Sequence, residues 1–156
     1  MNKVREAIIH QLLVENYNKY YRLAYSYVHN EADAMDIVQE GAYKAILKSD
    51  TLKNIDYAQT WIYRIIINEA LEFKRKNQRD TVDIKEDLII NSDSYTNFDL
   101  ERAIDELPAL DKTIIKLRFY EELKIEQIAD ITNENINTIK SRLYRTLKKL
   151  RLSIDM

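Results

Sequence analysis

The residues best suited to contact a charged ligand lie near the C-terminus, where cations and small polar side chains separate aliphatic ones. The aliphatic side chains recur at spacings of three and four, as one face of an α-helix requires: Ile136, Ile139, Leu143, Leu147 and Leu150. The other faces carry groups that can hydrogen-bond base edges in a major groove or contact phosphates. These candidate DNA-binding residues are Asn137, Thr138, Lys140, Ser141, Arg142, Arg145 and Lys148.

The segment before this helix has the pattern of a helix-turn-helix. Residues 125–131 predict a short helix, and Ala129 within it is small enough to let two helices cross closely. Asn133 stands in the turn, where asparagine tolerates a left-handed backbone, and Asn135 can cap the next helix. A short helix, a polar turn and a basic helix together favour DNA binding. The alternative is a solvated amphipathic helix whose outer face happens to be basic.

Composition narrows the classes of fold and function. The only glycine is Gly41 and the only proline is Pro108, which excludes the tight turns of an all-β fold and the glycine-rich loops that bind dinucleotides. The absence of cysteine excludes disulfides and thiolate metal sites. No apolar run is long enough to span a bilayer and the N-terminal stretch is unlike a signal peptide, so we expect an intracellular protein. The net charge of -2 hides local clusters of cations, and a nucleic-acid-binding face is local.

The elements that position these residues are predicted to be helices. The first runs from Val4 to Val28, where Tyr17, Tyr21, Ala24 and Val28 recur at spacings of three and four, as one helical face requires. A second helix opens at Asn30 or Glu31, where acids favour the first turn, and a third spans residues 58–77. A polar loop at 48–57 joins the second helix to the third.

The helical pattern fails after residue 77, where the chain becomes polar and acidic, with Asp80, Asp83, Glu86 and Asp87 close together. We interpret residues 78–99 as a flexible linker. Four shorter helices are expected beyond it, at residues 100–107, 109–119, 125–131 and 136–150. The predicted fold class is therefore all-α, with two small helical domains, 1–77 and 100–156, and the helix-turn-helix in the second.

Several stretches resemble one protein family and occur in the order that the family has. Residues 33–40 resemble the Asp-Ala-Glu-Asp-Leu-Val-Gln-Glu stretch of region two of RNA polymerase sigma factors, and residues 61–76 resemble its Trp-Leu-Tyr-Arg-Ile-Ala-x-Asn-x-Ala helix with a basic tail. Leu107-Pro108, residues 120–123 and residues 138–145 resemble region four. The chain is thus similar to extracytoplasmic-function (ECF) sigma factors, which keep only these two regions. It departs from the family at Ile66, where alanine is common, and at Glu122 and Asn133, where glycine is common.

The resemblance implies a factor that binds core RNA polymerase and directs promoter-specific initiation. Residues 1–77 would bind polymerase and the minus-ten promoter element, and residues 100–156 would bind the duplex minus-thirty-five element. The second helix would dock on the coiled coil of the β′ subunit, while the β flap would meet region four. The residues implied for the β′ contact are Asp33, Asp36, Gln39 and Glu40.

The minus-ten element is bound in this family as a melted single strand, which needs a cationic track and groups that stack on or hydrogen-bond exposed bases. The third helix and the loop before it supply such groups. By resemblance, the minus-ten residues are Asp50, Asn54, Trp61, Tyr63, Arg64, Asn68, Lys74, Arg75 and Lys76. Both aromatic side chains could instead belong to the core.

The resemblance also implies a cytoplasmic protein with an anti-sigma partner, which holds the factor at the membrane where that partner is membrane-anchored. No cofactor, metal or small-molecule substrate is expected, because His10 and His29 stand alone and no nucleophile with a base is present. We therefore expect no enzyme.

Two other functions remain open on the sequence. A polymerase-independent helix-turn-helix repressor or activator would bind an operator without polymerase, usually as a dimer. A helical adaptor or enzyme would not contact DNA. The basic tail at residues 74–76 favours the sigma factor, because a sensor domain has no need of it.

Overall fold

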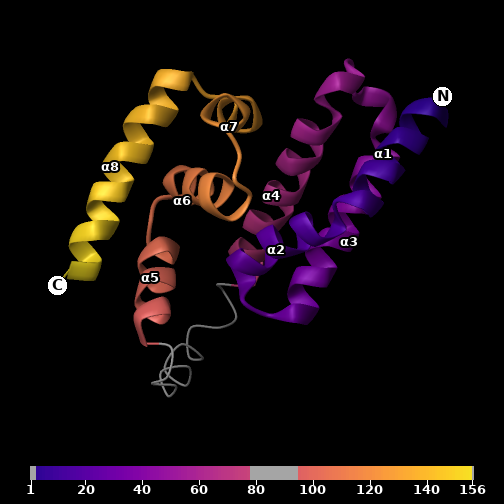
Figure 1. Ribbon diagram of the computed structural model, residues 1–156. Helices are drawn as coiled ribbons and strands as arrows, with labels where there is room; N and C mark the ends of the chain where they lie inside the picture. The colour runs from indigo at the N-terminus through magenta and orange to yellow at the C-terminus, as the bar shows by residue number, and fades with distance from the viewer. Residues whose placement is uncertain (1–2, 78–94, 156) are drawn as a thin grey trace. The chain divides into compact units, whose positions relative to one another are not determined.

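The computed structural model describes residues 3–77 and 95–155, and all regular structure in this part of the chain is helical (Figure 1). The chain divides into two compact units. One comprises Met1–Lys74 and Asp130–Asn133, and the other comprises Arg75–Ala129 and Glu134–Met156. The predicted all-α fold is confirmed. The predicted linker acids, from Asp80 to Asp87, lie outside the described residues.

The N-terminal helices are α1 (Lys3–Glu15), α2 (Tyr17–Val28), α3 (Glu31–Leu47) and α4 (Ala58–Asn77). Two 3-10 turns, η1 (Ser49–Thr51) and η2 (Ile55–Tyr57), shape the loop between α3 and α4. α2 packs along α3, and α1 contacts both α3 and η1. The predicted bounds of α4 are confirmed. The predicted start of α3 is confirmed as well, because the Asn30 side chain accepts a hydrogen bond from the Asp33 backbone N–H at 2.9 Å.

The single helix predicted from Val4 to Val28 is wrong, because the chain breaks at Asn16. The Asn16 backbone departs from helical values, with φ -109° and ψ 17°, and its backbone N–H and side chain both donate to the Leu12 carbonyl at 3.0 Å. Of the four residues that share one predicted face, Ala24 is buried, Tyr21 and Val28 are half-buried and Tyr17 is exposed. The buried residues of α2 are Tyr20, Leu23, Ala24, Ser26 and Tyr27.

The two faces of α2 were hard to separate because tyrosines lie on both. Tyr17, Tyr21 and Tyr25 form a row on the outer side, with neighbouring ring centroids 6.2 Å apart. Tyr20 and Tyr27 form the buried row. A spacing of three and four therefore occurs twice in this helix, and only packing against α3 and α4 distinguishes the two rows.

The C-terminal helices are α5 (Tyr95–Asp105), α6 (Ala109–Ile115), α7 (Ile125–Thr132) and α8 (Ile136–Asp155). A π-helical turn, η5 (Lys116–Tyr120), continues α6. α8 packs against α5 and α6. α5 begins within the segment predicted as linker, and α8 continues past its predicted end at Leu150.

Two turns of this region have left-handed residues where the sigma family commonly has glycine. Glu122 has φ 55° and Asn133 has φ 58°. The backbone N–H that follows each residue caps the preceding helix, since Leu123 donates to the Leu117 carbonyl and Glu134 donates to the Ala129 carbonyl, both at 3.0 Å. The left-handed conformation predicted for Asn133 is confirmed.

The apolar stripe of α8 is narrower than predicted. Ile139, Leu143 and Leu150 are buried, together with Thr146, whereas Ile136 and Leu147 are exposed. The last two lie on the edge of the stripe, so spacing alone could not exclude them. No helix in residues 3–77 and 95–155 has the length and apolar character needed to cross a membrane.

Candidate nucleic-acid interface

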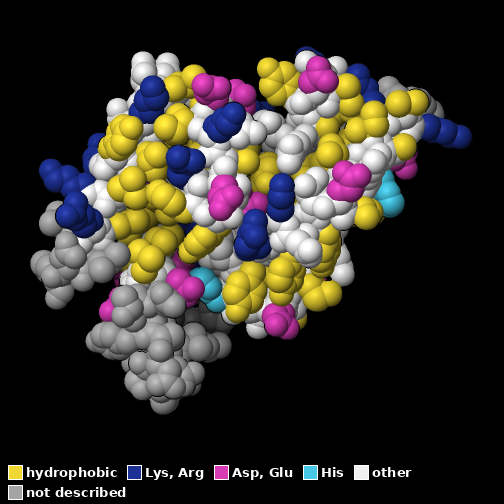
Figure 2. Space-filling view, in the orientation of Figure 1, with side chains coloured by type: hydrophobic (Ala, Val, Ile, Leu, Met, Phe, Trp, Pro, Cys, Tyr) yellow, Lys and Arg dark blue, Asp and Glu magenta, His cyan; other side chains and the backbone are white. Residues whose placement is uncertain are grey.

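The exposed face of α8 carries most of the residues predicted to bind duplex DNA. Lys and Arg side chains gather over this helix at the left of the space-filling view (Figure 2). The exposed members of the predicted set are Asn137, Lys140, Ser141, Arg145 and Lys148. Tyr144, which was not predicted as a site residue, is 66% exposed among them. The face thus offers cations, hydrogen-bonding groups and one aromatic ring to a partner.

The first turn of α8 is held by its predicted cap. The Asn135 side chain accepts a hydrogen bond from the Asn137 backbone N–H at 2.7 Å, so the capping role predicted for Asn135 is confirmed. Ala129 is buried in α7, as a close helix crossing requires. These local features give the start of α8 a defined direction and leave the Asn137 side chain exposed.

Among the residues predicted on α8, Arg142 forms an ion pair within the protein. Its Nη1 donates to Asp111 Oδ1 in α6 at 3.0 Å. Its side chain is 34% exposed and that of Asp111 is 14% exposed. Arg142 and Thr138 are half-buried on the flank of α8 rather than at the centre of its exposed face.

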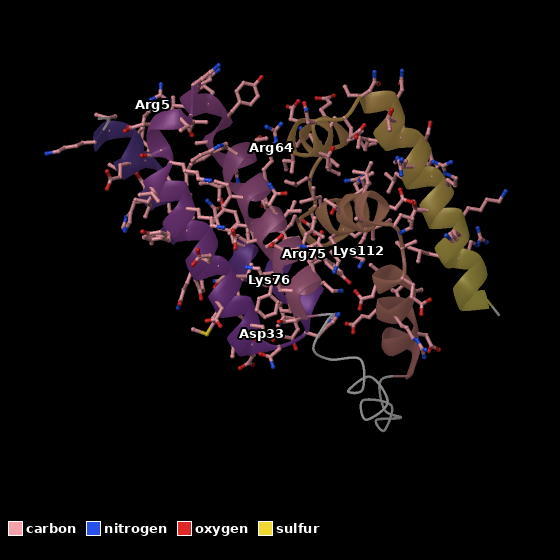
Figure 3. The ribbon with its side chains drawn as sticks, turned by 180° about the vertical axis from the view of Figure 1, so that it is seen from behind. Arg5, Asp33, Arg64, Arg75, Lys76 and Lys112 are labelled. Atoms are coloured by element: carbon pink, nitrogen blue, oxygen red, sulfur yellow. The ribbon has the colours of Figure 1, made fainter. Side chains whose placement is uncertain are left out.

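The predicted cationic track lies along α4. Arg64 lies in the first half of this helix, while Arg75 and Lys76 are near its C-terminal end (Figure 3). Asn68, Arg75 and Lys76 are exposed, whereas Arg64, Lys74 and Trp61 are half-buried. The spacing of these groups along one helix suits an extended polyanion.

Tyr63 does not belong to this track. Its side chain is only 2% exposed, and its ring packs edge-on against Tyr20 of α2, with centroids 5.3 Å apart and planes at 82°. A ring held in this way has no face on which a base could stack. The stacking role predicted for Tyr63 is therefore corrected to a core role, whereas Trp61 remains partly accessible.

The loop at residues 48–57 is held from both ends and from α1. Asp50 and Asn54 are exposed, but the Asn54 side chain accepts from the Asp56 backbone N–H at 3.0 Å and so caps η2. Arg5 of α1 donates to the Leu52 carbonyl and, at 3.2 Å, to the Lys53 carbonyl. Leu52 is buried beneath the loop.

A different surface lies on α3. Asp36, Gln39 and Glu40 are exposed on this helix, and Asp33 is half-buried near its start (Figure 3). Two large side chains continue the row at spacings of three and four, since Tyr43 is 62% exposed and Leu47 is 66% exposed. Acids beside exposed apolar groups suit a protein partner that is both basic and apolar.

A salt bridge ties this surface to α4. The Lys44 ammonium of α3 pairs with the Glu69 carboxylate of α4. The hydrogen bond to Glu69 raises the pKa of Lys44 above its ordinary value, against an opposing effect of desolvation. Lys44 therefore stays charged at neutral pH, and the pair helps to keep α3 and α4 in register. In residues 3–77 and 95–155, no group of three His, Cys, Asp or Glu side chains is placed to hold a metal ion.

Comparison with known proteins identifies the family. Residues 12–80 match the family described as Sigma-70 region 2, and residues 97–150 match Sigma-70, region 4. The chain is 43% identical to RNA polymerase sigma factor SigV of Bacillus subtilis over 96% of this chain and 92% of that protein. It is 31% identical to the ECF RNA polymerase sigma-E factor of Haemophilus influenzae over 92% of this chain and 86% of that protein. The chain is an ECF sigma factor.

This sigma factor therefore binds core RNA polymerase and directs promoter-specific initiation of transcription, and the polymerase-independent repressor or activator is not favoured. Its fold is similar to that of RpoE in complex with the anti-sigma factor NepR from Bartonella quintana, with a TM-score of 0.70, 25% identity, and coverage of 94% of this chain and 96% of that one. CnrH in complex with the cytosolic domain of CnrY has a similar fold, with a TM-score of 0.74, 18% identity, and coverage of 94% and 87%.

Three features of the sigma factor were missed on the sequence. Arg5 lies far along the chain from the loop that it contacts, and Asp111 lies far from Arg142, so no spacing pattern joins either pair. Tyr43 and Leu47 could have been found, because they continue the spacing of Asp36 and Glu40 along one helical face.

Proposed function

We propose that the two domains of this sigma factor bind different targets. Residues 1–77 would bind core polymerase and the melted minus-ten element, residues 100–156 would bind the duplex minus-thirty-five element, and residues 78–99 would link them. The observation that carries the proposal is the presence of two chemically different surfaces, the acidic and apolar face of α3 and the basic face of α8. Binding through both domains raises promoter affinity through effective concentration.

The face of α3 is proposed to dock on the coiled coil of the β′ subunit. Its acceptors are Asp33, Asp36, Gln39 and Glu40, and they can pair with cations of the partner. The neighbouring Tyr43 and Leu47 add apolar area that would be removed from water. Region four is proposed to meet the β flap.

The minus-ten element is proposed to follow α4. Lys74, Arg75 and Lys76 would contact its phosphates, with Asn68 and Trp61 beside exposed bases. Arg64 would join them by exchanging its hydrogen bonds to the Ile131 and Asp130 carbonyls for bonds to a phosphate. The loop residues Asp50 and Asn54 would border the pocket for a flipped base. The fixed position of this loop, held by Arg5, supports a role in base selection, because a pocket must keep its shape when it is empty.

The minus-thirty-five element is proposed to receive α8 in its major groove. The outermost side chains, Asn137, Ser141 and Lys148, would face base edges, while Lys140 and Arg145 on either side would contact phosphates. Thr138 and Arg142 complete the predicted set on the flank of the helix. The support is the exposure of all five central side chains on a helix whose opposite face is buried.

We also propose an anti-sigma partner and a cytoplasmic location. Solved relatives of similar fold are complexes of RpoE with the anti-sigma factor NepR and of CnrH with the cytosolic domain of CnrY. The exposed apolar side chains on α3 would suit such a partner, which holds the factor at the membrane where it is itself membrane-anchored. The chain would carry no catalysis of its own, since the polymerase performs the chemistry.

Run-off transcription with core polymerase and a genomic promoter library tests the proposal. We expect specific transcripts only when both the chain and core polymerase are present. Asp36→Lys should weaken polymerase binding by about tenfold, or about 1.4 kcal/mol, through charge repulsion at the interface. The control Glu15→Lys changes an exposed acid on α1 and should leave binding unchanged. Operator binding without polymerase would instead support the repressor.

A further inference from the structure

Asp111 and Arg142 form an ion pair between α6 and α8 that is sheltered on one side and open on the other. The Asp111 side chain is 14% exposed and the Arg142 side chain is 34% exposed, with Nη1 and Oδ1 3.0 Å apart. Asp111 lies in the first turn of α6, where the helix dipole stabilises a negative charge. The carboxylate is therefore a fixed anchor, and the guanidinium extends from it toward solvent.

The Arg142 guanidinium has N–H donors that its hydrogen bond to Asp111 does not use. The structure gives Arg142 one side-chain hydrogen bond among the residues that it describes, although an arginine carries five N–H donors. The guanidinium is planar and its donors form a rigid fork, so holding Nη1 also sets the direction of the others. A side chain oriented in this way loses less conformational entropy when it meets a second acceptor.

The place of Arg142 on α8 indicates what that acceptor is. Successive residues of an α-helix are turned by roughly 100°, so Arg142 lies to one side of the row formed by Asn137, Ser141 and Lys148. It stands between that exposed row and the buried Ile139 and Thr146. When a helix lies in a major groove, its outermost row faces base edges and its flanks face the phosphates that line the groove.

We propose that Asp111 is a positioning residue of the duplex-DNA surface, and that its carboxylate directs Arg142 to a phosphate of the minus-thirty-five duplex rather than to a base. This inference rests on the proposed function of α8. Arg142 then contributes to the affinity for DNA and not to sequence preference. Through Asp111, α6 also contributes to DNA binding, although no residue of α6 was predicted to contact DNA. Asp111 and Arg142 act as one unit.

The opposite role for Asp111 would be to hold the Arg142 guanidinium away from DNA. A carboxylate near DNA repels phosphates, and a pair that merely held Arg142 back would weaken binding. The two roles predict opposite effects when the charge of Asp111 is removed. Asp111→Asn is the suitable change because it keeps the size of the side chain and removes its charge.

The test uses the full chain with core polymerase and promoters recovered by run-off transcription. Binding to DNA with an intact or a scrambled minus-thirty-five element is measured over a range of salt concentrations for Arg142→Ala, Asp111→Asn and the double variant. Glu126→Gln is the matched control, because it removes an exposed acid from α7. Arg142→Lys keeps the charge without the fork. Melting temperatures establish that each variant is folded.

We expect Arg142→Ala to weaken binding to both DNAs by about the same factor, on the order of tenfold, and to reduce the salt slope by about one. Arg142→Lys should restore the salt slope. Asp111→Asn should weaken binding by about threefold in the parent chain and should have no further effect beside Arg142→Ala. Glu126→Gln should not weaken binding.

Three results would overturn the inference. Arg142→Ala could change the preference for the intact over the scrambled element, which would make Arg142 a base contact. Asp111→Asn could strengthen binding beyond the effect of Glu126→Gln, which would indicate that Asp111 holds the guanidinium away from DNA, or it could weaken binding equally beside Arg142→Ala. Arg145→Ala separates the inference from the proposed function. If neither Arg145→Ala nor Arg142→Ala weakens DNA binding, the proposed role of α8 is wrong. If only Arg145→Ala weakens DNA binding, α8 keeps its proposed role and the roles inferred for Arg142 and Asp111 are wrong.

Discussion

Gly41 of α3 lies directly against Ile66 of α4, so that a Cβ on Gly41 would come within 2.6 Å of the Ile66 Cδ1 atom. Both residues are buried, and Ile66 is fully buried. The family commonly has alanine at the position of Ile66, and the larger side chain here fills the space that Gly41 leaves. This contact therefore sets how closely α3, the helix proposed to bind polymerase, approaches α4, the helix proposed to bind the melted strand.

Gly41→Ala should destabilise the protein through this contact. Overpacking a core costs about 1–3 kcal/mol, which exceeds the gain of roughly 1 kcal/mol in helix propensity when alanine replaces glycine. We expect a net loss of about 1 kcal/mol in the free energy of unfolding, measured by urea titration. The second variant is Ile66→Ala, which leaves a cavity in the parent chain. It should lower the free energy of unfolding less when Gly41→Ala is also present. Additive effects of the two changes would contradict direct packing.

Glu122→Gly should stabilise the protein, whereas Asn133→Gly should have little effect. Both residues have a left-handed backbone, with φ 55° and φ 58°. That conformation costs most side chains about 1–2 kcal/mol, but asparagine adopts it readily. Glycine loses more backbone entropy on folding, so the net gain at Glu122 should be about 0.5–1 kcal/mol. Thermal unfolding of the two variants in parallel measures the difference, and equal shifts would refute the explanation.

Arg5→Ala should impair selection of the minus-ten element without affecting polymerase binding. Arg5 donates to the carbonyls of Leu52 and Lys53, and its loss leaves the loop that carries Asp50 and Asn54 less well held. We expect the preference for the correct minus-ten sequence to fall by about tenfold, or about 1.4 kcal/mol, in open-complex assays with core polymerase. Lys3→Ala, which removes an exposed cation from the same helix, is the control. An equal loss of minus-ten preference with both variants would indicate that removal of a positive charge, and not loss of the loop contacts, causes the effect.

Substitutions of Tyr63 and Trp61 should affect different properties, the stability of the protein for Tyr63 and DNA binding for Trp61. Tyr63→Ala removes a buried ring and should cost about 3–5 kcal/mol of unfolding free energy, as aromatic-to-alanine changes in cores do. Trp61→Ala should instead weaken binding of single-stranded minus-ten DNA by about 1–3 kcal/mol, the usual contribution of a stacked base. Fluorescence anisotropy of the holoenzyme and urea titration of the free chain measure the two effects. A stable Tyr63→Ala protein with a DNA-binding defect would reverse the assignment.

Features that depend on neighbouring residues were predictable from the sequence. The caps at Asn30 and Asn135 and the left-handed turn at Asn133 involve hydrogen bonds or backbone conformations within a few residues, so residue type and spacing determine them. The bounds of α4 follow in the same way from an uninterrupted helical pattern.

Features that depend on residues far apart in the chain needed the tertiary structure. Either row of tyrosines on α2 satisfies the helical spacing, and only packing selects Tyr20 over Tyr21 for the core. The same is true of Tyr63, for which the sequence left a DNA surface and the core both open and which the fold places against Tyr20.

The sequence by itself thus determined the helical fold class, the start of α3, the bounds of α4, the cap of α8 and the supply of cations and acids, because local hydrogen bonding and helical periodicity are properties of a short stretch of chain. The fold alone decided that Arg5 holds the loop at residues 48–57 and that Asp111 holds Arg142. Each of these contacts joins groups more than thirty residues apart, with sequence separations of 48 and 31. No spacing along one helix encodes such a contact, since it exists only after separate helices have packed.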